Sequence, residues 1–481
     1  MIIINIILLS FLYSDISPGY TLFSPLPNQG GGSYTTYLID NNGEYINTWT
    51  HDCKPVSISY LLPDSSLVIP CTQNEVNGLG GGNQLTGGRI LKLSWDGNIL
   101  WDDIFLDSSY QPHHDIEPLP NGNVLFITYE RKSYSEAILA GRVNINNEIW
   151  PSYILELEQV SLDSSKIIWE WHLWDHTIQD IDSTLSNYGI ISDYPGLLDI
   201  NLGTLGGGGG SAGDWLHLNA IDYNPEFNLI AISSRKMNEF YFIDHSTTTE
   251  QAATSSGGNF NRGGNFIYRW GNPQNYHRGD PSDKKLTSQH SVNWIDNNYP
   301  GGGDIILFNN RTEEVGSEIM QITIPIDNFL YELNSQESHP PENPSWTYSD
   351  GSFFSNIQSG ALRLENGNTL ISIGDSPTFF EIDSLNNEVW NYTFTGPSGQ
   401  SFNGNIARAQ KYSTSYMEGN LIPGDLNSDS IVNILDVILL VDLIVNETIE
   451  FNYSSLYDLN QDESIDILDI VLLINIILGN Y

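Results

Sequence analysis

Four histidines lie at the start of chain segments that resemble one another. The segments are "HHDIEPLPNGN", "DWLHLNAIDYN" and "SQHSVNWIDNN", and they contain His113 and His114, then His217, then His290. A fourth segment of this kind, "IQSGALRLENGN", has Gln358 and Ser359 at the corresponding place. Imidazole transfers protons and acts as a nucleophile near neutral pH. One such histidine would be an ordinary structural residue, but three in register favour a shared site for acid–base or covalent chemistry.

Two arginines extend this pattern. Arg235 lies one strand after His217, in "AISSRKMNEFYFID", and Arg311 follows His290 in "ILFNNRTEEVGS". A guanidinium group binds oxyanions through paired hydrogen bonds, so this combination suits an anionic substrate. The alternative for each arginine is a salt bridge to a nearby carboxylate. In a chain with a formal net charge of −41, a cationic pocket would be a local exception, which favours function.

Composition and motifs exclude several classes of protein. The 59 acidic residues against 18 basic ones would repel a phosphate backbone, so we expect no nucleic-acid partner. The sequence contains no G-x-S-x-G, H-E-x-x-H, P-loop or paired C-x-x-C motif, and we expect no nucleotide cofactor. Pairs of carboxylates are so common in this chain that they give a glycosidase no specific support.

A repeated pair of half-units must position these residues. The first is strand, turn, then a strand that ends in Trp; clear copies lie at 37–49, 91–101, 155–169 and 380–390, and looser ones end at Trp270 and Trp346. The second is an inner strand pair with a hairpin turn, at 61–69, 118–127, 222–232, 296–308 and 362–373. Their alternation predicts an all-β fold, a six-bladed β-propeller, with "IARAQKY" (406–412) closing against 19–26. Five or seven blades and an array of two-sheet sandwiches are the alternatives.

The propeller places the histidines. Its innermost strands line the central channel, so His217, His290 and one of His113 and His114 would converge there. Adjacent residues of an extended strand point to opposite faces, so only one of that pair can face the channel. Long Gly-, Asn- and Ser-rich insertions at 73–88, 130–150, 176–214 and 251–288 would roof a pocket. The glycine run at 202–215 is typical of a lid hinge or, equally, of disorder.

Both the N-terminus and the two cysteines bear on location. Residues 1–18 contain a short apolar run that predicts a signal peptide, with a first buried strand as the alternative. No later segment predicts a transmembrane helix. Cys53 and Cys71 bracket a strand–turn–strand segment that could bring them together, either as a disulfide or as two buried thiols. We therefore expect a protein that is secreted, periplasmic or on the cell surface.

The last 61 residues, 421–481, contain one element twice. Oxygen-bearing side chains recur at positions 1, 3, 5, 9 and 12 of two loops, with a backbone carbonyl at position 7, which is the ligand spacing of an EF-hand-type calcium loop. The predicted ligands are Asp425, Asn427, Asp429, Ile431, Asn433 and Asp436 in the first loop, and Asp458, Asn460, Asp462, Ser464, Asp466 and Asp469 in the second. Each loop precedes an apolar helical stretch. The pattern predicts a small α-helical domain that binds two Ca²⁺ ions.

This tail resembles a type I dockerin, which implies docking onto a cohesin-like protein. Dockerins usually have small hydroxyl residues at loop positions 10 and 11. Here those positions are Ile434 and Leu435, then Ile467 and Leu468. The calcium prediction does not depend on them, but the identity of the partner does.

The preceding residues, 19–416, resemble the arylsulfotransferase family of secreted aryl-sulfate sulfotransferases. The resemblance rests on long phrases, including "DWLHLNAIDYNPEFNLIAISSRKMNEFYFIDHSTTTEQA", "GGNFIYRWGNPQNYHRGDPSDKKLTSQHSVNWID", "WEWHLWDHTIQD", "PHHDIEPLPNGNVL" and "SGALRLENGNTLISIGD". It implies a six-bladed propeller that moves a sulfuryl group from a phenolic ester to another phenol, through a sulfohistidine and without a nucleotide donor.

The resemblance also implies roles for particular residues. His217 and His290 match family histidines, His114 is favoured over His113, and Arg311 is the best match for the sulfate-binding arginine. We predict His217, His290, His114 and Arg311 as catalytic, and Arg235, His113 and Gln358 as substrate-binding. The better-studied branch has its nucleophilic histidine on a later blade, where this chain has "NIQSGALRL". The alternative function is therefore a non-catalytic propeller that binds an anion or glycan, tethered through its tail.

Overall fold

The computed structural model describes residues 15–27, 32–73, 79, 86–206, 213–312, 316–325, 337–396, 402–414, 416, 424, 426, 432–446, 458–460 and 464–478. The chain divides into two compact units, one of residues 1–60 and 67–411 and the other of residues 61–66 and 412–481. The predicted signal peptide lies mostly outside the described residues. Asp15 and Ser17 already contact the sixth blade: the Asp15 carbonyl accepts from Asn368, and the Ser17 amide donates to Glu381.

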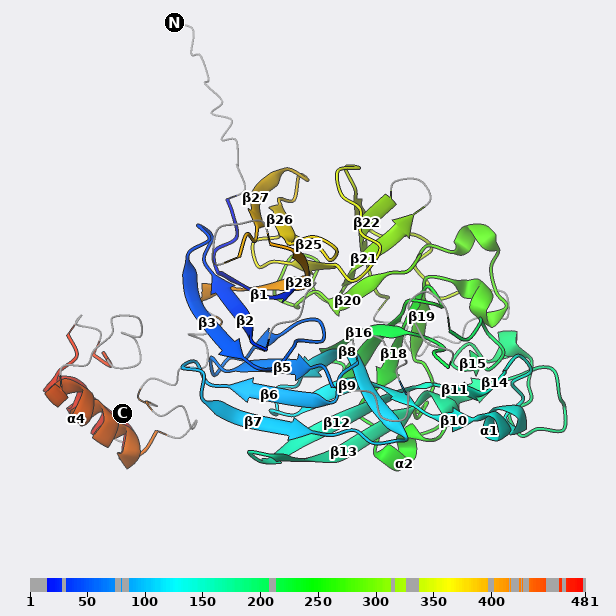
Figure 1. Cartoon of the computed structure of the whole chain (residues 1–481), viewed down its shortest axis with the longest axis horizontal. Coiled ribbons are helices and arrows are strands. Elements are labelled where there is room, and N and C mark those ends of the chain that lie inside the picture. Colours follow the sequence, from blue (N-terminus) through cyan, green and yellow to red (C-terminus); the bar gives the residue numbers. More distant parts are fainter. Residues whose placement is uncertain are drawn as a thin grey trace, which may run out of the picture. The chain divides into compact units, whose positions relative to one another are not determined.

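Six four-stranded antiparallel sheets are arranged round a common centre (Figure 1), which confirms the predicted six-bladed propeller. From the centre outwards, blade 1 contains β28 (Gly404–Tyr412), β1 (Tyr20–Pro27), β2 (Tyr34–Ile39) and β3 (Tyr45–His51). Blade 2 contains β4 (Tyr60–Leu61), β5 (Leu67–Cys71), β6 (Arg89–Leu93) and β7 (Ile99–Ile104). Blade 3 contains β8 (Tyr110–Pro118), β9 (Val124–Glu130), β12 (Ser152–Ser161) and β13 (Ser164–His172).

The other three blades repeat this arrangement. Blade 4 contains β16 (Leu218–Asn224), β17 (Leu229–Ser234), β18 (Glu239–Asp244) and β19 (Tyr268–Trp270). Blade 5 contains β20 (His290–Trp294), β21 (Ile305–Thr312), β22 (Gly316–Ile322) and β23 (Trp346–Tyr348). Blade 6 contains β24 (Gly360–Arg363), β25 (Thr369–Ile373), β26 (Thr378–Ile382) and β27 (Glu388–Thr393). Middle strands such as β17 and β18 are buried along their whole length, because each blade packs between two others.

The ring closes through the two ends of the propeller. β28 lies beside β1 in the sheet of blade 1, as predicted from "IARAQKY". Closure of this kind removes exposed sheet edges, because the strand that ends the propeller completes the blade that begins it. It also makes β28 an innermost strand, like β8, β16 and β20, so its side chains lie at the central channel.

The repeated tryptophans bind each blade to the next one. All six lie on an outermost strand, and the indole N–H of five donates to the following blade: Trp49 to the Ser94 carbonyl, Trp101 to Ser165 Oγ, Trp169 to the Thr247 carbonyl, Trp270 to the Pro341 carbonyl and Trp390 to the Asn41 carbonyl. The sixth ring, Trp346, lies against the Arg363 guanidinium of blade 6 at 5.0 Å. Each indole hydrogen bond contributes about 0.5–1.5 kcal/mol, so the repeat seen in the sequence is a set of inter-blade contacts.

The long insertions are folded where the structure describes them. They contain β10 (Lys132–Ser133), α1 (Tyr134–Leu139), β11 (Glu148–Ile149), η1 (Leu173–His176), β14 (Thr177–Ile178), η2 (Ile191–Asp193), β15 (Leu198–Asp199), α2 (Thr249–Ala252), η3 (Pro273–Tyr276) and η4 (Pro281–Asp283). Two buried arginines hold them in place. Arg142 donates to the carbonyls of Ile200, Leu202 and Gly203. Of the predicted hinge, residues 207–212 lie outside the described residues.

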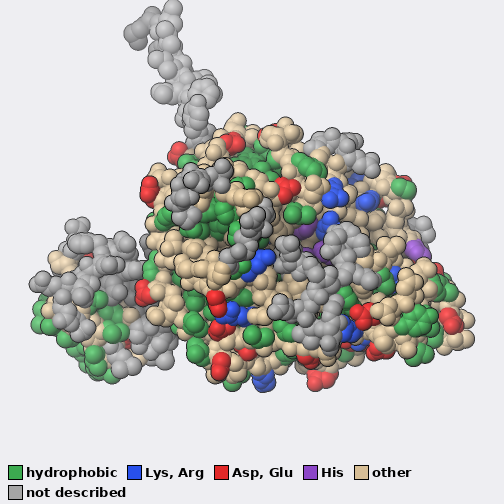
Figure 2. All heavy atoms as spheres, viewed as in Figure 1, with side chains coloured by type: hydrophobic (Ala, Val, Ile, Leu, Met, Phe, Trp, Pro, Cys, Tyr) green, Lys and Arg blue, Asp and Glu red, His purple; other side chains and the backbone are tan. Residues whose placement is uncertain are grey.

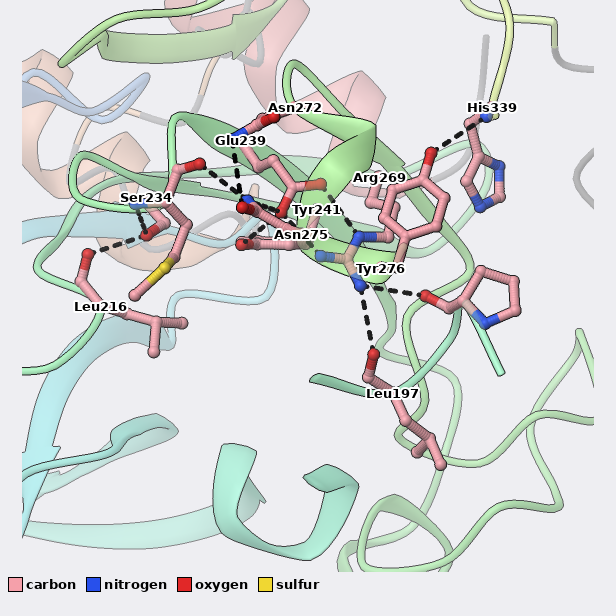
Figure 3. A network of polar contacts seen from close by, with 12 residues as sticks. Leu197, Leu216, Ser234, Glu239, Tyr241, Arg269, Asn272, Asn275, Tyr276 and His339 are labelled. Carbon is pink, nitrogen blue, oxygen red and sulfur yellow. Dashed lines mark hydrogen bonds and ion pairs between the residues drawn. The ribbon is translucent and has the colours of Figure 1, made fainter. Parts of the chain in front are cut away.

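Arg269 is the second of these arginines (Figure 3). Its guanidinium forms a fully buried ion pair with Glu239 at 2.7 Å and stacks on the Tyr276 ring at 4.4 Å. It also donates to the Leu197 carbonyl in the preceding insertion. Burying this charge is tolerable only because all its neighbours are acceptors or ring faces. Arg142 and Arg269 therefore link the insertions to one another and to blade 4.

The second unit contains the two predicted helices, α4 (Ile434–Asn446) and α6 (Ile467–Ile477). They contact each other through a small apolar core that includes Val437, Leu440 and Leu473. Among the described residues, no helix has the length and apolar character needed to cross a bilayer.

Candidate active site

The inner strands begin with a local distortion in three successive blades. His114, His217 and Ser291 all have positive φ angles, between 53° and 59°. At His114 and Ser291, and directly after His217, the pairing between the inner strand and its neighbour shifts register, as at a β-bulge. A bulge bends the strand and re-aims the side chain beside it, at a cost in backbone strain. Gln358 and Ser359, just before β24, also have positive φ values, 47° and 81°.

These distorted segments surround a small pocket, whose empty space together with the open solvent at its mouth is about 280 Å³. Its lining comes from the inner segments of all six blades and is almost entirely polar: Ser57, His114, Asn219, His290, Ser291, Gln358, Ser359, Ala407 and Arg408. Figure 2 shows histidine and Lys or Arg side chains together at a hollow in the middle of the face that it displays. Most side chains that line the pocket are neutral or cationic, although the protein as a whole is acidic.

Three imidazoles from two blades lie in contact at one side of the pocket. His114 lines the pocket, and its ring centroid is 4.6 Å from that of His217 on the next blade. His113 is not part of the pocket lining; it stacks on Tyr129 at 3.6 Å, and its Nδ1 lies 2.7 Å from the Nδ1 of His114. One of these two nitrogens must therefore donate and the other accept, which couples the protonation of His114 to that of His113.

His217 and His290 are each held by a different partner. The Nδ1 of His217 lies 2.7 Å from Asp214 Oδ2, in a pair that is almost fully buried. The Nδ1 of His290 lies 2.7 Å from Asn310 Oδ1, also buried. Neither Asp214 nor Asn310 was among the residues predicted from the sequence. The sequence could have indicated Asp214, because it lies three residues before His217 in "DWLH".

Burial and mutual repulsion keep most of these rings neutral. Burial, together with the charge of His217, lowers the pKa of His113 to about 3 and that of His114 well below its usual value. Burial lowers the pKa of His290 to about 3; Arg235 and His217 act in the same direction, and contacts with Asn310 and the Ser288 carbonyl oppose them. Burial would raise the pKa of Asp214, but the charge and hydrogen bond of His217 outweigh it and lower this pKa, so Asp214 is a carboxylate.

The arginine that lines the pocket is Arg408 on β28, which was not predicted. It donates to Asp115 at 2.6 Å and to Ser291 Oγ at 3.3 Å. The closing strand was recognised in the sequence, so applying the inner-strand rule to it would have found Arg408. Arg311, the predicted sulfate-binding arginine, has an exposed side chain at the end of β21 and is not part of the pocket lining. Arg235 is half-buried, and its charge lowers the pKa of both His114 and His290.

Arg408 also adjoins a group of buried acids from blades 3 and 4. Asp115 accepts from the Tyr60 hydroxyl as well as from Arg408. Burial and the neighbouring carboxylates raise the pKa of Glu117 well above its usual value, and burial raises that of Asp222 to about 7. Arg408 therefore separates an imidazole-lined pocket from a partly protonated acidic layer.

A disulfide fixes one wall of the pocket. Cys53 and Cys71 are bonded, with Cα atoms 5.2 Å apart, which decides between the two alternatives that the sequence left open. The segment after Cys53 pairs with β5 through Val56 and Pro70. Ser57, the next residue, lines the pocket and donates to the His114 carbonyl.

The predicted calcium loops are described in part. Asp425, Asn427, Asp429, Ile431 and Asp462 lie outside the described residues. Both position-12 carboxylates are fully buried and accept two backbone amides of their own loop, Asp436 from Leu426 and Asn433, and Asp469 from Asn460 and Asp466. Among the described residues, no three His, Cys, Asp or Glu side chains form a ready-made metal cluster. The stretch from 412 to 481 has twelve acidic residues and no Lys, Arg or His. The described carboxylates therefore fit a cation.

The fold and the site together define a class, namely a six-bladed β-propeller with an imidazole- and guanidinium-lined pocket at its centre. The sequence model of the arylsulfotransferase (ASST) family matches residues 21–416, and the chain belongs to that family. A type I dockerin domain matches residues 423–478. A search of curated proteins finds no match.

Several solved structures are similar to this chain at low sequence identity. A protein of unknown function from Bacteroides caccae is 12% identical over 82% of this chain and 99% of its own, with a TM-score of 0.42. A streptogramin B lyase is 13% identical over 83% and 95%, with a TM-score of 0.35. Virginiamycin B lyase from Staphylococcus aureus is 11% identical over 78% and 85%, with a TM-score of 0.33. All three scores are below 0.5, so these structures say nothing about the activity of this chain.

Proposed function

We propose that this protein is a secreted aryl-sulfate sulfotransferase, which moves a sulfuryl group from one phenolic ester to another phenol through a pocket histidine. The observation that carries the proposal is a pocket lined by His114, His290 and Arg408, with the ring of His217 in contact with that of His114. Membership of the arylsulfotransferase family supports the same reaction. The donor and acceptor are small aromatic sulfate esters and phenols, and no nucleotide takes part.

The positive groups at the pocket suit the charge of the transferred group. The sulfuryl oxygens of the donor carry one negative charge, which Arg408 at the pocket wall and the nearby Arg235 would stabilise. Arg311, at the rim, would draw anions toward the opening rather than hold them. His113, buried behind His114, would influence the reaction only through its shared hydrogen bond. Gln358 would contribute a neutral hydrogen bond from the pocket wall.

His217 is suited to carry a proton in both halves of the reaction. Asp214 holds its Nδ1–H and stabilises the positively charged ring, so Nε2 can give a proton and take it back. In the first half, a neutral imidazole attacks sulfur, the bond from sulfur to the donor oxygen breaks, and that oxygen receives the proton from His217. In the second half, His217 accepts the proton of the acceptor phenol, whose oxygen attacks sulfur as the nitrogen–sulfur bond breaks.

The test is a transfer assay with 4-nitrophenyl sulfate, with and without an excess of phenol. We expect release of 4-nitrophenol that depends on the acceptor, formation of the sulfated acceptor, and loss of both in His217→Ala and His290→Ala. His277→Ala, at an exposed histidine, is the matched control and should keep full activity. Release that ignores the acceptor would indicate a hydrolase. Absence of turnover with every phenol would favour the anion- or glycan-binding alternative.

For the second unit, we propose two bound Ca²⁺ ions and a cohesin-like docking partner. The ligands would be the twelve loop residues predicted from the sequence. Support comes from the dockerin match and from the equivalent arrangement of Asp436 and Asp469 in the two loops. Dockerin domains occur on extracellular proteins, which agrees with secretion through the predicted N-terminal signal peptide and with the disulfide.

A further inference from the structure

The side chain of Asn310 has only one possible orientation. Its Nδ2 group donates two hydrogen bonds, to the Ser355 and Gln358 carbonyls, both at 3.1 Å. An amide nitrogen has two N–H groups, so both are used, and Oδ1 must be the atom 2.7 Å from His290 Nδ1. An amide oxygen only accepts, so His290 carries its proton on Nδ1.

The tautomer of His290 follows from this contact. With one proton fixed on Nδ1, a neutral ring has its lone pair on Nε2, the nitrogen that can attack sulfur. Burial and the charge of Arg235 lower the pKa of His290 to about 3, which favours the neutral ring near neutral pH.

The other two imidazoles are less suited to attack. His217 has a carboxylate partner at Nδ1, an arrangement that suits a proton carrier. His114 shares a proton between two Nδ1 atoms with His113, so its tautomer depends on a second ring. His290 lines the pocket, and it is the imidazole whose lone pair is fixed on Nε2 by the hydrogen bond that its Nδ1–H donates to Asn310.

We propose that His290 is the residue that accepts the sulfuryl group, and that Asn310 is the positioning residue that holds its reactive tautomer. This assignment rests on the sulfotransferase function proposed above. The Nε2 lone pair of His290 forms the bond to sulfur while the bond from sulfur to the donor oxygen breaks, and the donor oxygen takes its proton from His217. The ring keeps its Nδ1–H, and the positive charge that it gains is offset by the negative sulfuryl oxygens. Attack by the acceptor phenol reverses these steps and restores neutral His290.

The assignment is tested on the wild-type protein by peptide mapping. The protein is mixed with 4-nitrophenyl sulfate without acceptor, quenched in base and digested with trypsin. His290 is the sole histidine of tryptic peptide 286–311, whereas His217 and the His113–His114 pair fall in peptides 167–235 and 93–131. We expect the mass of one SO₃ group on peptide 286–311, and its loss on adding phenol. An active protein with the group on either other peptide overturns the assignment but not the sulfotransferase function. No transfer with any phenol overturns both.

Two variants at Asn310 test the positioning role. Asn310→Ala leaves Nδ1 free to lose its proton, so we expect the rate of sulfuryl capture to fall by between about 10²- and 10⁴-fold with little change in KM. Asn310→Asp keeps an acceptor at Nδ1 and should capture the group at least tenfold faster than Asn310→Ala. A thermal melt of each variant controls for folding. Equal rates in the two folded variants, or a defect confined to KM, would refute the role of Asn310.

Discussion

Replacing Asp214 by Asn tests the role of His217 as proton carrier. The carboxylate of Asp214 is 1% exposed and lies 2.7 Å from His217 Nδ1, so it forms a buried charge-assisted hydrogen bond with the charged ring. Such a bond is worth about 1.5–3 kcal/mol, which corresponds to a factor of about 10 to 150 in the rate of a step in which His217 transfers a proton. Asn is nearly isosteric but neutral. The variant should therefore fold and lose transfer rate by a comparable factor.

The size of this loss should depend on the donor. A basic phenolate leaves only if it is protonated, whereas 4-nitrophenolate leaves readily as an anion. We therefore expect a loss of about 10- to 150-fold with phenyl sulfate or 4-methylphenyl sulfate, and a much smaller loss with 4-nitrophenyl sulfate. The assay is kcat/KM for each donor, with released phenol measured by chromatography.

Two results would refute this reasoning. An equal loss for all donors would mean that Asp214 acts on the structure of the pocket and not on the departing oxygen. No loss with basic donors would mean that His217 carries no proton in the reaction. Thermal unfolding of the variant and the activity of His277→Ala serve as controls.

Four other changes have expected outcomes. Arg408→Gln should raise KM for the aryl sulfate and destabilise the propeller by about 3–5 kcal/mol, because Asp115 is left buried without its cation; adding Asp115→Asn should recover the melting temperature but not KM. The Cys53→Ala/Cys71→Ala variant should lose about 3 kcal/mol in denaturant unfolding, since the bond closes a loop with a sequence separation of 18. Removing calcium with EDTA should unfold residues 421–481 by circular dichroism and leave the propeller transition unchanged; an unaltered tail would disprove the calcium sites. The pKa of Asp222 is raised to about 7 from a usual 3.8, so between these pH values the folded protein holds a proton that the unfolded chain releases. The stability of the propeller should therefore fall as the pH rises from about 4 to about 7, measured as the melting temperature at each pH. Asp222→Asn should make the melting temperature less dependent on pH in this range.

The architecture was accessible from the sequence because its signals are local. Hairpin turns and strand alternation depend on a few neighbouring residues, and their repetition indicated six blades before any contact was known. The tryptophan repeat was visible for the same reason, although only the structure shows that each indole binds the next blade. The pairing of β28 with β1 followed from the need to close the ring.

The composition of the pocket was accessible only in part. His114, His290 and Gln358 line it, and His217 lies against His114, in keeping with their shared position at the start of inner strands. The arginine that lines the pocket is Arg408 and not Arg311, the one that was predicted, which is exposed. The reason is that Arg408 enters through the last strand of the chain, more than 290 residues after its partner Asp115. No spacing within one repeat encodes such a contact.

The sequence by itself therefore predicted six blades and their order, the two-loop tail and the histidines of the channel, since each of these depends on short-range patterns. The tertiary structure decided what each imidazole can do. Positive φ angles and bulges turn His114 into the pocket and leave His113 stacked on Tyr129, which strand alternation alone could not settle. Asp214 and Asn310 then give His217 and His290 their hydrogen-bond partners at Nδ1, and Asn310 fixes the tautomer of His290. Protonation and tautomer depend on a single hydrogen-bond partner, and that partner is chosen by the folded chain.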